Sequence, residues 1–225
     1  MLTSRSTAEL LAAFSSSDPT PGGGSAAALM GAIGASLLAM VAGMPKTRTG
    51  APEERTALDA ARLTLVGLTQ TLRDLVDRDA AAYDQVVAAF RQPKSTDAEK
   101  SARATAIQHA MRVATEAPVE TFQACARALV AGQAVAAHGN PSAKSDVAAG
   151  MQALIAATWG ALFNVEINIG SLKDTALVDR FTASVRTAHA EAQAATRAML
   201  DEPGVAELMQ KTGARLGGHG GLPED

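Results

Sequence analysis

The sequence predicts an all-α protein, a single-domain helical bundle with long antiparallel helices. Apolar residues recur at the helical spacing of three and four, and no segment alternates between apolar and polar residues as a strand does. The 225 residues are 47% hydrophobic but only 3% aromatic, so small and aliphatic side chains dominate and let helices approach closely. No linker long enough to divide domains interrupts the pattern. We therefore expect one helical domain over residues 1–212 and a flexible, glycine-rich tail over 213–225.

Capping residues and prolines set the expected order of the helices. Thr96 and Glu99 have the spacing of a capping box, and Pro118 suits the first turn of a new helix. Gly139 suits a left-handed C-terminal cap, and Ser145 suits an N-cap. We expect helices over 7–16, from the glycines at 22–24 to about 43, and over 53–91, 96–116, 118–138, 146–170, 175–200 and 203–211.

Charge and metal-ligand content argue against several classes of protein. A net charge of −3 and a pI of about 5.8 give no field that draws the protein to nucleic acid. A single cysteine, Cys125, excludes an internal disulfide framework, and the four histidines form no i,i+4 pair, so we expect no metal site. No signal peptide is visible, because Glu9 and Asp18 interrupt the N-terminal region, and we expect a cytoplasmic protein.

Three glycines in "PTPGGGS" (19–25) directly precede an uncharged run from Ala26 to Met44. The run approaches the length of a membrane span, but Ala and Gly supply most of it and no second such segment is apparent, so we expect no membrane insertion. A phosphate-binding loop is also disfavoured, since the Lys-Ser/Thr pair and a preceding strand are missing. A tight turn with Ser25 as N-cap remains, either purely structural or at the mouth of a site that a ligand approaches closely.

The small-residue helix after these glycines is expected at a crowded contact between helices. Its Ala27, Gly31, Gly34 and Ala35 suit the centre of the bundle, and a contact between two copies of the chain would use them equally well.

One carboxylate interrupts the apolar seam of the long helix over 53–91. Steps of three and four give nine seam positions, of which only Asp79 is polar. The other eight are Leu58, Ala61, Leu65, Leu68, Leu72, Leu75, Ala82 and Val86. Burying an unpaired carboxylate is costly, so Asp79 requires a partner, a water-filled cavity or a raised pKa. It is a candidate general acid or base, and pairing with an arginine or capping a neighbouring helix is the structural alternative.

Other polar residues are weaker candidates. Asn164 and Asn168 share one face of the helix over 146–170 and suit either a heterocycle or backbone carbonyls in the core. Asp146 lies in the first turn of that helix, where the helix dipole alone explains a carboxylate. Lys46 follows the glycine helix in a loop, as a solvated charge or as a contact for an acidic ligand.

Together these segments resemble the cyclodeaminase/cyclohydrolase family, which includes the C-terminal domain of formiminotransferase-cyclodeaminase and methenyltetrahydrofolate cyclohydrolase. The resemblance covers most of the chain and is most specific at the glycine stretch. The matching segments are "PTPGGGSAAALMGAIGASLLAMVAGM", "RDAAAYDQVVAAFRQPK", "AIQHAMRVATEAPVE", "HGNPSAKSDVAAG" and "ALFNVEINIGSLKD". Relatives often continue the glycine helix with a K-x-Y piece, whereas this chain reads "PKTRTG" and has no aromatic residue there.

The resemblance implies a homodimer that acts on tetrahydrofolate one-carbon adducts without a metal or other cofactor. The two activities are hydrolysis of 5,10-methenyltetrahydrofolate to 10-formyltetrahydrofolate and cyclisation of 5-formiminotetrahydrofolate with release of ammonia. It places the catalytic carboxylate at Asp79. The implied substrate-binding residues are Gly22, Gly23, Gly24, Ser25, Lys46, Asp146, Asn164 and Asn168.

Two other classes of function remain as alternatives. A non-catalytic helical dimer serving as a binding or scaffold module explains the Ala-rich bundle, but not a seam carboxylate beside a glycine turn. A four-helix-bundle metalloenzyme is disfavoured because the Glu-x-x-His pairs of that class are missing.

Overall fold

The computed structural model describes residues 1–215, and every regular element in that range is helical. The order is η1 (Leu2–Ser4), α1 (Thr7–Phe14), α2 (Gly23–Ala42), α3 (Pro52–Phe90), α4 (Asp97–His138), η2 (Pro141–Ala143), α5 (Lys144–Ile169), α6 (Thr175–Asp201) and α7 (Pro203–Arg215). The all-α fold with long antiparallel helices is confirmed. Residues 216–225, which make up most of the predicted tail, lie outside the described residues.

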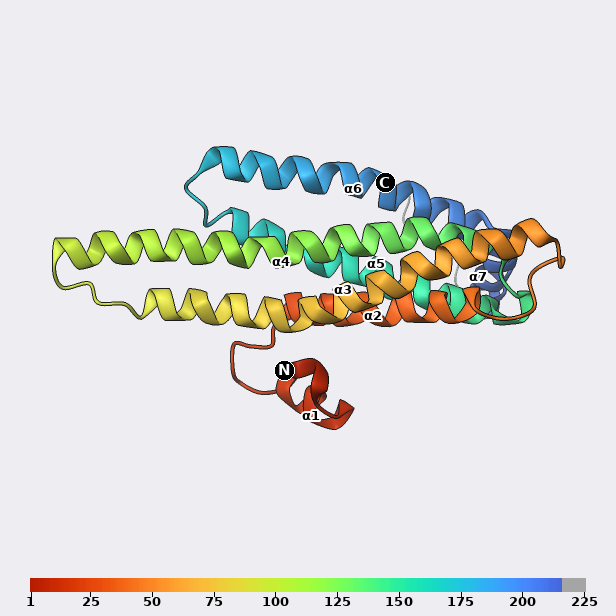
Figure 1. Cartoon of the computed structure of the whole chain (residues 1–225), viewed down its shortest axis with the longest axis horizontal. Coiled ribbons are helices and arrows are strands. Elements are labelled where there is room, and N and C mark those ends of the chain that lie inside the picture. Colours follow the sequence, from red (N-terminus) through yellow and green to blue (C-terminus); the bar gives the residue numbers. More distant parts are fainter. Residues whose placement is uncertain (216–225) are drawn as a thin grey trace.

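Helices α2, α3, α4 and α5 form the body of the bundle. α2 packs against α3 and α5, α4 packs against α3 and α5, and α6 lies along α4 (Figure 1). Close approaches along the chain show that α2 runs antiparallel to both neighbours: Gly31 faces Leu72 of α3, and Gly34 faces Gly150 of α5. The start of α2 and the loop after it therefore lie at opposite ends of this helix.

The small residues of helix α2 face the interior of the bundle, whereas its outer face is exposed at Ile33 and Met40. Ala27, Gly31, Gly34 and Ala35 are all buried. A Cβ at Gly34 would lie 2.7 Å from the carbonyl oxygen of Gly150, so the two backbones meet at a distance that only glycine permits.

Two helical segments have the length and composition of a membrane span, over residues 23–42 and 141–169. In the 18-residue window of the first, 61% of the residues are buried inside the bundle, as in the core helix of a water-soluble protein.

The helical hairpin of α3 and α4 extends beyond the start of α2 (Figure 1). A separate apolar cluster holds this extension together, formed by Ala82, Val86, Ala89, Ala110, Met111 and Ala114. As a result, the N-terminus of α2 meets the side of α3 rather than its end. Asp79 lies at this junction.

The predicted break at Pro118 is wrong, since α4 runs without interruption from Asp97 to His138. Proline has no N–H for the carbonyl four residues earlier, which leaves the carbonyl of Ala114 without its helical donor. The side chain of Asn168 in α5 donates to that carbonyl over 2.8 Å. A side chain from a neighbouring helix thus replaces the missing backbone bond.

Several predicted caps are also wrong. Gly139 is extended, with φ −65° and ψ 164°, rather than left-handed. α5 begins at Lys144 with Ala143 as its N-cap, so Ser145 already lies inside the helix. α2 begins at Gly23 with Gly22 as its N-cap, so Ser25 is the third helical residue and its side chain is free for another contact. α7 continues to Arg215, beyond the predicted end of this helix at residue 211.

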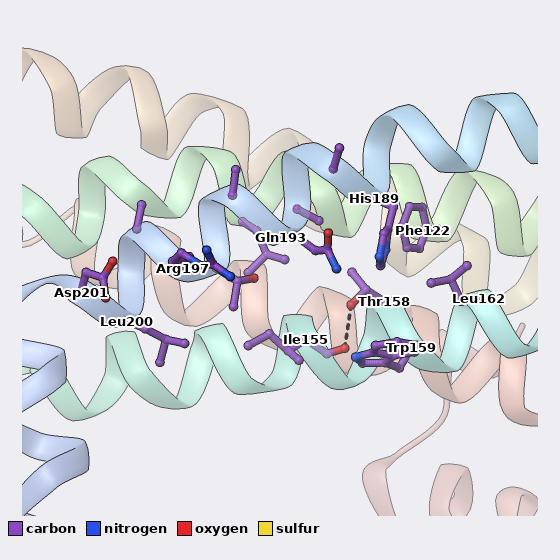
Figure 2. Close-up of a pocket in the computed structure, with 16 residues that line it drawn as sticks. Phe122, Ile155, Thr158, Trp159, Leu162, His189, Gln193, Arg197, Leu200 and Asp201 are labelled. Atoms are coloured by element: carbon purple, nitrogen blue, oxygen red, sulfur yellow. Dashed lines mark hydrogen bonds between the residues drawn. The ribbon is translucent and has the colours of Figure 1, made fainter. Parts of the chain in front are cut away.

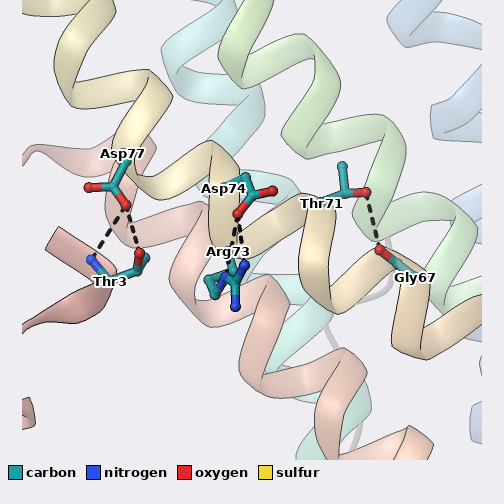
Figure 3. A network of polar contacts seen from close by, with 6 residues as sticks. All are labelled: Thr3, Gly67, Thr71, Arg73, Asp74 and Asp77. Atoms are coloured by element: carbon teal, nitrogen blue, oxygen red, sulfur yellow. Dashed lines mark hydrogen bonds and ion pairs between the residues drawn. The ribbon is translucent and has the colours of Figure 1, made fainter. Parts of the chain in front are cut away.

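The N-terminal segment is attached to α3 by Asp77, which flanks the apolar seam. Thr3 donates to Oδ2 of Asp77 from its hydroxyl over 2.7 Å and from its backbone N–H, as Figure 3 shows, and the N–H of Leu2 donates to Oδ1. These bonds lower the pKa of Asp77 against the opposing effect of burial. Asp77 therefore has a structural role, although it lies only two residues from Asp79.

Candidate active site

Asp79 is the one polar position in the α3 seam, and the structure places it as the periodicity predicts. All eight apolar seam residues are buried, and Asp79 is partly buried. Its carboxyl group meets the first turn of α2. Since the seam faces the bundle, the carboxyl group is directed inward rather than to bulk solvent.

Two residues of the glycine turn hold this carboxyl group. The hydroxyl of Ser25 lies 2.8 Å from Oδ2 of Asp79, and the backbone N–H of Ser25 donates to the same carboxyl group. A Cβ on Gly24 would lie 2.6 Å from Cγ of Asp79, so only glycine leaves room for it. The carboxylate also lies at the positive end of the α2 dipole, which stabilises its charge.

The environment raises the pKa of Asp79. Desolvation by burial is the largest cause, and the side-chain and backbone hydrogen bonds from Ser25 oppose it. No arginine or lysine contributes an opposing charge to this shift. The alternative that Asp79 forms a structural ion pair is therefore not supported within the described residues 1–215.

Asn164 of α5 lies on the other side of the glycine turn. Its Nδ2 lies 3.3 Å from the position that a Cβ of Gly23 would take, and it donates to the carbonyl of Gly160 over 2.8 Å. Within residues 1–215, no donor is found for its Oδ1. That oxygen is available to accept a hydrogen bond from a ligand at the turn.

A cleft of about 400 Å³ borders this corner. It is lined by Pro21, next to the glycines, by Ala80, Ala81 and Asp84, which follow Asp79 on α3, and by residues of the N-terminal segment. Asp79 itself does not line the cleft. Asp84 is exposed and accepts from the hydroxyl of Thr20 over 3.2 Å, as expected for a solvated side chain.

The remaining predicted binding residues do not gather at this corner. Asn168 uses its amide for the carbonyl of Ala114, which accounts for the residue structurally. Asp146 precedes Asn164 by 18 residues on the same helix, a separation of about 27 Å at 1.5 Å per residue. Lys46 follows the far end of α2 and is exposed. Within a single chain the structure therefore places neither Asp146 nor Lys46 at the Asp79 corner, because α2 and α5 are long and antiparallel.

The loop that carries Lys46 has an internal structure of its own. Glu54 accepts from the hydroxyl of Thr47 over 2.6 Å and from the backbone N–H groups of Thr49 and Gly50, which lowers its pKa to about 2. Arg48 forms an ion pair with Glu202 over 3.1 Å. This loop is held by protein contacts rather than arranged around an empty anion site.

A groove of about 830 Å³ lies elsewhere, between α5 and α6 (Figure 2). Trp159, Phe122 and His189 form its aromatic part, with the Phe122 and His189 rings stacked 6.2 Å apart. Gln193 and Arg197 form its polar part. Sequence reasoning missed this groove because its lining comes from helices distant in sequence and follows no motif.

The Asp79 corner combines the features of a proton-transfer site. The partly buried carboxyl group of Asp79 has a raised pKa and a hydrogen bond to the Ser25 hydroxyl. It lies beside a glycine turn that a ligand can approach closely and near the amide oxygen of Asn164, which can accept a hydrogen bond. This corner resembles sites in which one carboxyl group exchanges a proton with a bound substrate.

Comparisons with known proteins give the family. The family model described as formiminotransferase-cyclodeaminase matches residues 6–187. Methenyltetrahydrofolate cyclohydrolase of Methylorubrum extorquens is 34% identical over 181 residues, which cover 80% of this chain and 87% of that protein. Formimidoyltransferase-cyclodeaminase of Sus scrofa is 35% identical over 170 residues, 74% of this chain but only 30% of the longer protein.

The fold has a solved counterpart. The crystal structure of formiminotetrahydrofolate cyclodeaminase from Thermotoga maritima superimposes with a TM-score of 0.81 and covers 92% of this chain and 99% of that one, at 19% identity. At this identity the likeness concerns the fold. The family match and the sequence identities carry the assignment: the chain belongs to the formiminotransferase-cyclodeaminase family.

Proposed function

We propose that the chain is a tetrahydrofolate one-carbon enzyme that hydrolyses 5,10-methenyltetrahydrofolate to 10-formyltetrahydrofolate. The observation that carries the proposal is the sheltered Asp79 carboxyl group, held by Ser25 at the start of α2. The cyclohydrolase of Methylorubrum extorquens supports this substrate, since the match covers 87% of that protein.

In this proposal Asp79 manages the protons of the hydrolysis. Water attacks the cationic carbon that bridges N5 and N10, and the Asp79 carboxylate accepts the proton that the water loses. Asp79 then donates a proton to N5 as the C–N5 bond breaks and the former water oxygen becomes the formyl oxygen. One proton is released overall, and the carboxylate is restored. Its negative charge also stabilises the cationic substrate.

The second candidate is the cyclodeaminase reaction, which the 35% identity to formimidoyltransferase-cyclodeaminase of Sus scrofa supports. N10 of 5-formiminotetrahydrofolate attacks the formimino carbon, and the N10 proton passes to the imino nitrogen, which becomes an amino group. A second proton then converts this group to ammonia, which leaves as its C–N bond breaks and gives the methenyl cation. The tetrahedral carbon and the proton transfers resemble those of the hydrolysis, so the same carboxyl group serves both reactions.

Turnover of the two folates, measured side by side with the wild-type protein, tests the proposal. We expect methenyltetrahydrofolate to be hydrolysed well above its spontaneous rate. Formation of methenyltetrahydrofolate and ammonia from the formimino substrate alone would assign the cyclodeaminase reaction instead. A protein that turns over neither folate and shows no thermal shift with 5-formyltetrahydrofolate would instead support the alternative of a non-catalytic helical scaffold.

The proposal includes a homodimer formed through the outer face of α2. Ile33 and Met40 on this face are 51% and 46% exposed, and Leu63 of the adjacent α3 is 79% exposed. Ile33 lies ten residues after Gly23 and nine before Ala42, near the middle of α2. A two-fold axis there pairs two copies of α2 antiparallel, and each Gly23 end then lies beside the partner's opposite end.

This arrangement accounts for the separation of the predicted binding residues. Lys46 lies too far along α2 to reach a folate at Asp79 in its own chain, but antiparallel pairing brings the second copy's loop to that corner. We expect Ile33→Asp to give monomers in light scattering and Val130→Asp, an exposed valine on α4, to leave the dimer intact. Monomeric wild-type protein would contradict the proposal. The proposed function also includes a reaction without a metal or organic cofactor and a cytoplasmic location.

A further inference from the structure

We propose that Ser25 is a positioning residue that sets the protonation state of Asp79 by reorienting its hydroxyl. The inference rests on the proposed function, in which Asp79 gains and loses a proton in each turnover. It differs from the sequence expectation that Ser25 binds the substrate.

The hydroxyl of Ser25 has one proton and two acceptors within reach. Its Oγ lies 2.8 Å from Oδ2 of Asp79 and 3.0 Å from the carbonyl oxygen of Val76. One O–H donates to only one of them at a time. The side chain is 0% exposed, so neither water nor substrate replaces either partner without movement of the helices.

The two orientations match the two states of the carboxyl group. When Asp79 is ionised, the Ser25 hydroxyl donates to its charged Oδ2. The carbonyl of Val76 then keeps the bond from its own helix, because it lies in the interior of α3. When Asp79 is protonated on Oδ2, its O–H donates to Oγ of Ser25, and the Ser25 hydroxyl turns to Val76.

No heavy atom needs to move between the two states. In both protonation states the Ser25 N–H donates to the carboxyl group, which occupies the space left by the missing side chain of Gly24. Both buried polar groups therefore remain satisfied before and after each proton transfer, which keeps the cost of the change small. Without the hydroxyl, the ionised form loses a charge-assisted bond and burial favours the neutral form.

The ionisable side chains near Asp79 on α3 are either bonded to other residues or exposed to solvent. On α3, Arg78 pairs with Glu120 of α4 over 2.6 Å, and Asp77 is bound by Thr3. Tyr83, one turn further along α3, is exposed. The first turn of α2 has no ionisable side chain, and Asn164 of α5 is neutral. Ser25 is thus the polar side chain bonded to the Asp79 carboxyl group.

The test is the titration of the Asp79 side-chain carboxyl carbon by NMR in the wild type, Ser25→Ala and Ser25→Cys, with Asp79→Asn to assign the signal. We expect the pKa of Asp79 to rise in Ser25→Ala and to rise less in Ser25→Cys, which keeps the volume and a weaker donor. Ser36→Ala, on the same helix but bonded to Ala32, is the matched control and leaves the pKa unchanged.

Kinetics give a second readout. Loss of one hydrogen bond to a charged group predicts a decrease of about 10–100-fold in kcat/KM at neutral pH, carried by kcat. The lower pH limit of activity moves to higher pH, and in an Asp79→Asn background Ser25→Ala has no further effect. A purely structural role changes thermal stability without moving the pH limit.

An unchanged Asp79 pKa and pH profile in folded Ser25→Ala would overturn the inference. Failure of the proposed function gives a different result, since the wild type then turns over neither folate while the NMR titration still measures the coupling between Ser25 and Asp79.

Discussion

The carboxyl group of Asp79 occupies the space that a side chain at Gly24 would need. A Cβ at position 24 would lie 2.6 Å from Cγ and 2.8 Å from Oδ2 of Asp79. The glycine stretch and the seam carboxylate, which are 55 residues apart in the sequence, are therefore one structural unit. Gly24 is required for close approach and not for an unusual φ, because the only positive-φ glycine in residues 1–215 is Gly50.

Gly24→Ala should therefore abolish activity by displacing the carboxyl group. We expect the variant to lose at least about 10²-fold in kcat, since a small misplacement of a reacting group has effects of this size. Gly67→Ala on α3 is the control, because its Cβ would meet no atom within 4 Å. It should keep full activity and gain about 0.5–1 kcal/mol of stability from helix propensity. Equal activity of the two variants would show that the contact is unimportant.

Asp79→Asn should stabilise the protein at neutral pH. The folded-state pKa of Asp79 lies above its ordinary value of 3.8, so between these two values the native state binds more protons than the unfolded state. The free energy of unfolding therefore falls as pH rises through this window, and it stays lower above it. The amide of the Asp79→Asn variant does not titrate, so the variant does not lose free energy of unfolding in this way. Thermal unfolding from pH 3 to pH 7 should show a growing advantage for Asp79→Asn, and a growing disadvantage would contradict the raised pKa.

Asn168→Ala should destabilise the protein by about 1–3 kcal/mol, because the carbonyl of Ala114 loses its donor. The contribution can be isolated in a double-mutant cycle with Pro118→Ala. Alanine at position 118 restores the backbone N–H, so Asn168→Ala should cost much less in that background. Denaturant unfolding of the four proteins measures the coupling. Additive effects would mean that Asn168 does not replace the missing helical bond.

Glu54→Gln should lower the melting temperature at neutral pH by weakening the loop over 45–50. Glu54 is 6% exposed, and its pKa falls from 4.5 to about 2 because the hydroxyl of Thr47 and the neighbouring N–H groups bind its charged form. The contribution of these hydrogen bonds to the free energy of unfolding is fully present above pH 4.5 and is lost as pH falls towards 2. The difference in melting temperature between wild type and variant should shrink over this range. A difference that does not depend on pH would contradict the assignment.

The central part of the site was predictable because it depends on periodicity. Asp79 departs from a seam of eight apolar residues, and a nine-position pattern on one helix is visible in the sequence without tertiary information. The role of Gly24 was only partly predictable. The glycines indicated close approach, and the structure shows that the carboxyl group of Asp79 in the same chain approaches Gly24 in this way.

The predictions of a helix break at Pro118 and of a cap at Ser25 failed because a tertiary contact overrides a local signal. Pro118 predicts a helix start by its own chemistry, but Asn168 from another helix compensates for the missing N–H. Ser25 suits an N-cap, but Gly22 takes that position and the serine hydroxyl goes to Asp79. Lys46 and Asp146 were assigned to the substrate site by resemblance, which carries no information on their distance from Asp79 along straight helices, and their roles stay predictions.

The most direct test of the account is the rate of methenyltetrahydrofolate hydrolysis by the wild type and Asp79→Asn at neutral pH. Loss of a general acid–base group predicts a decrease in kcat of about 10²–10⁴-fold in a variant that remains folded and at least as stable as the wild type. An Asp79→Asn protein that hydrolyses this substrate at the wild-type rate would contradict the assignment of Asp79 as the catalytic carboxyl group.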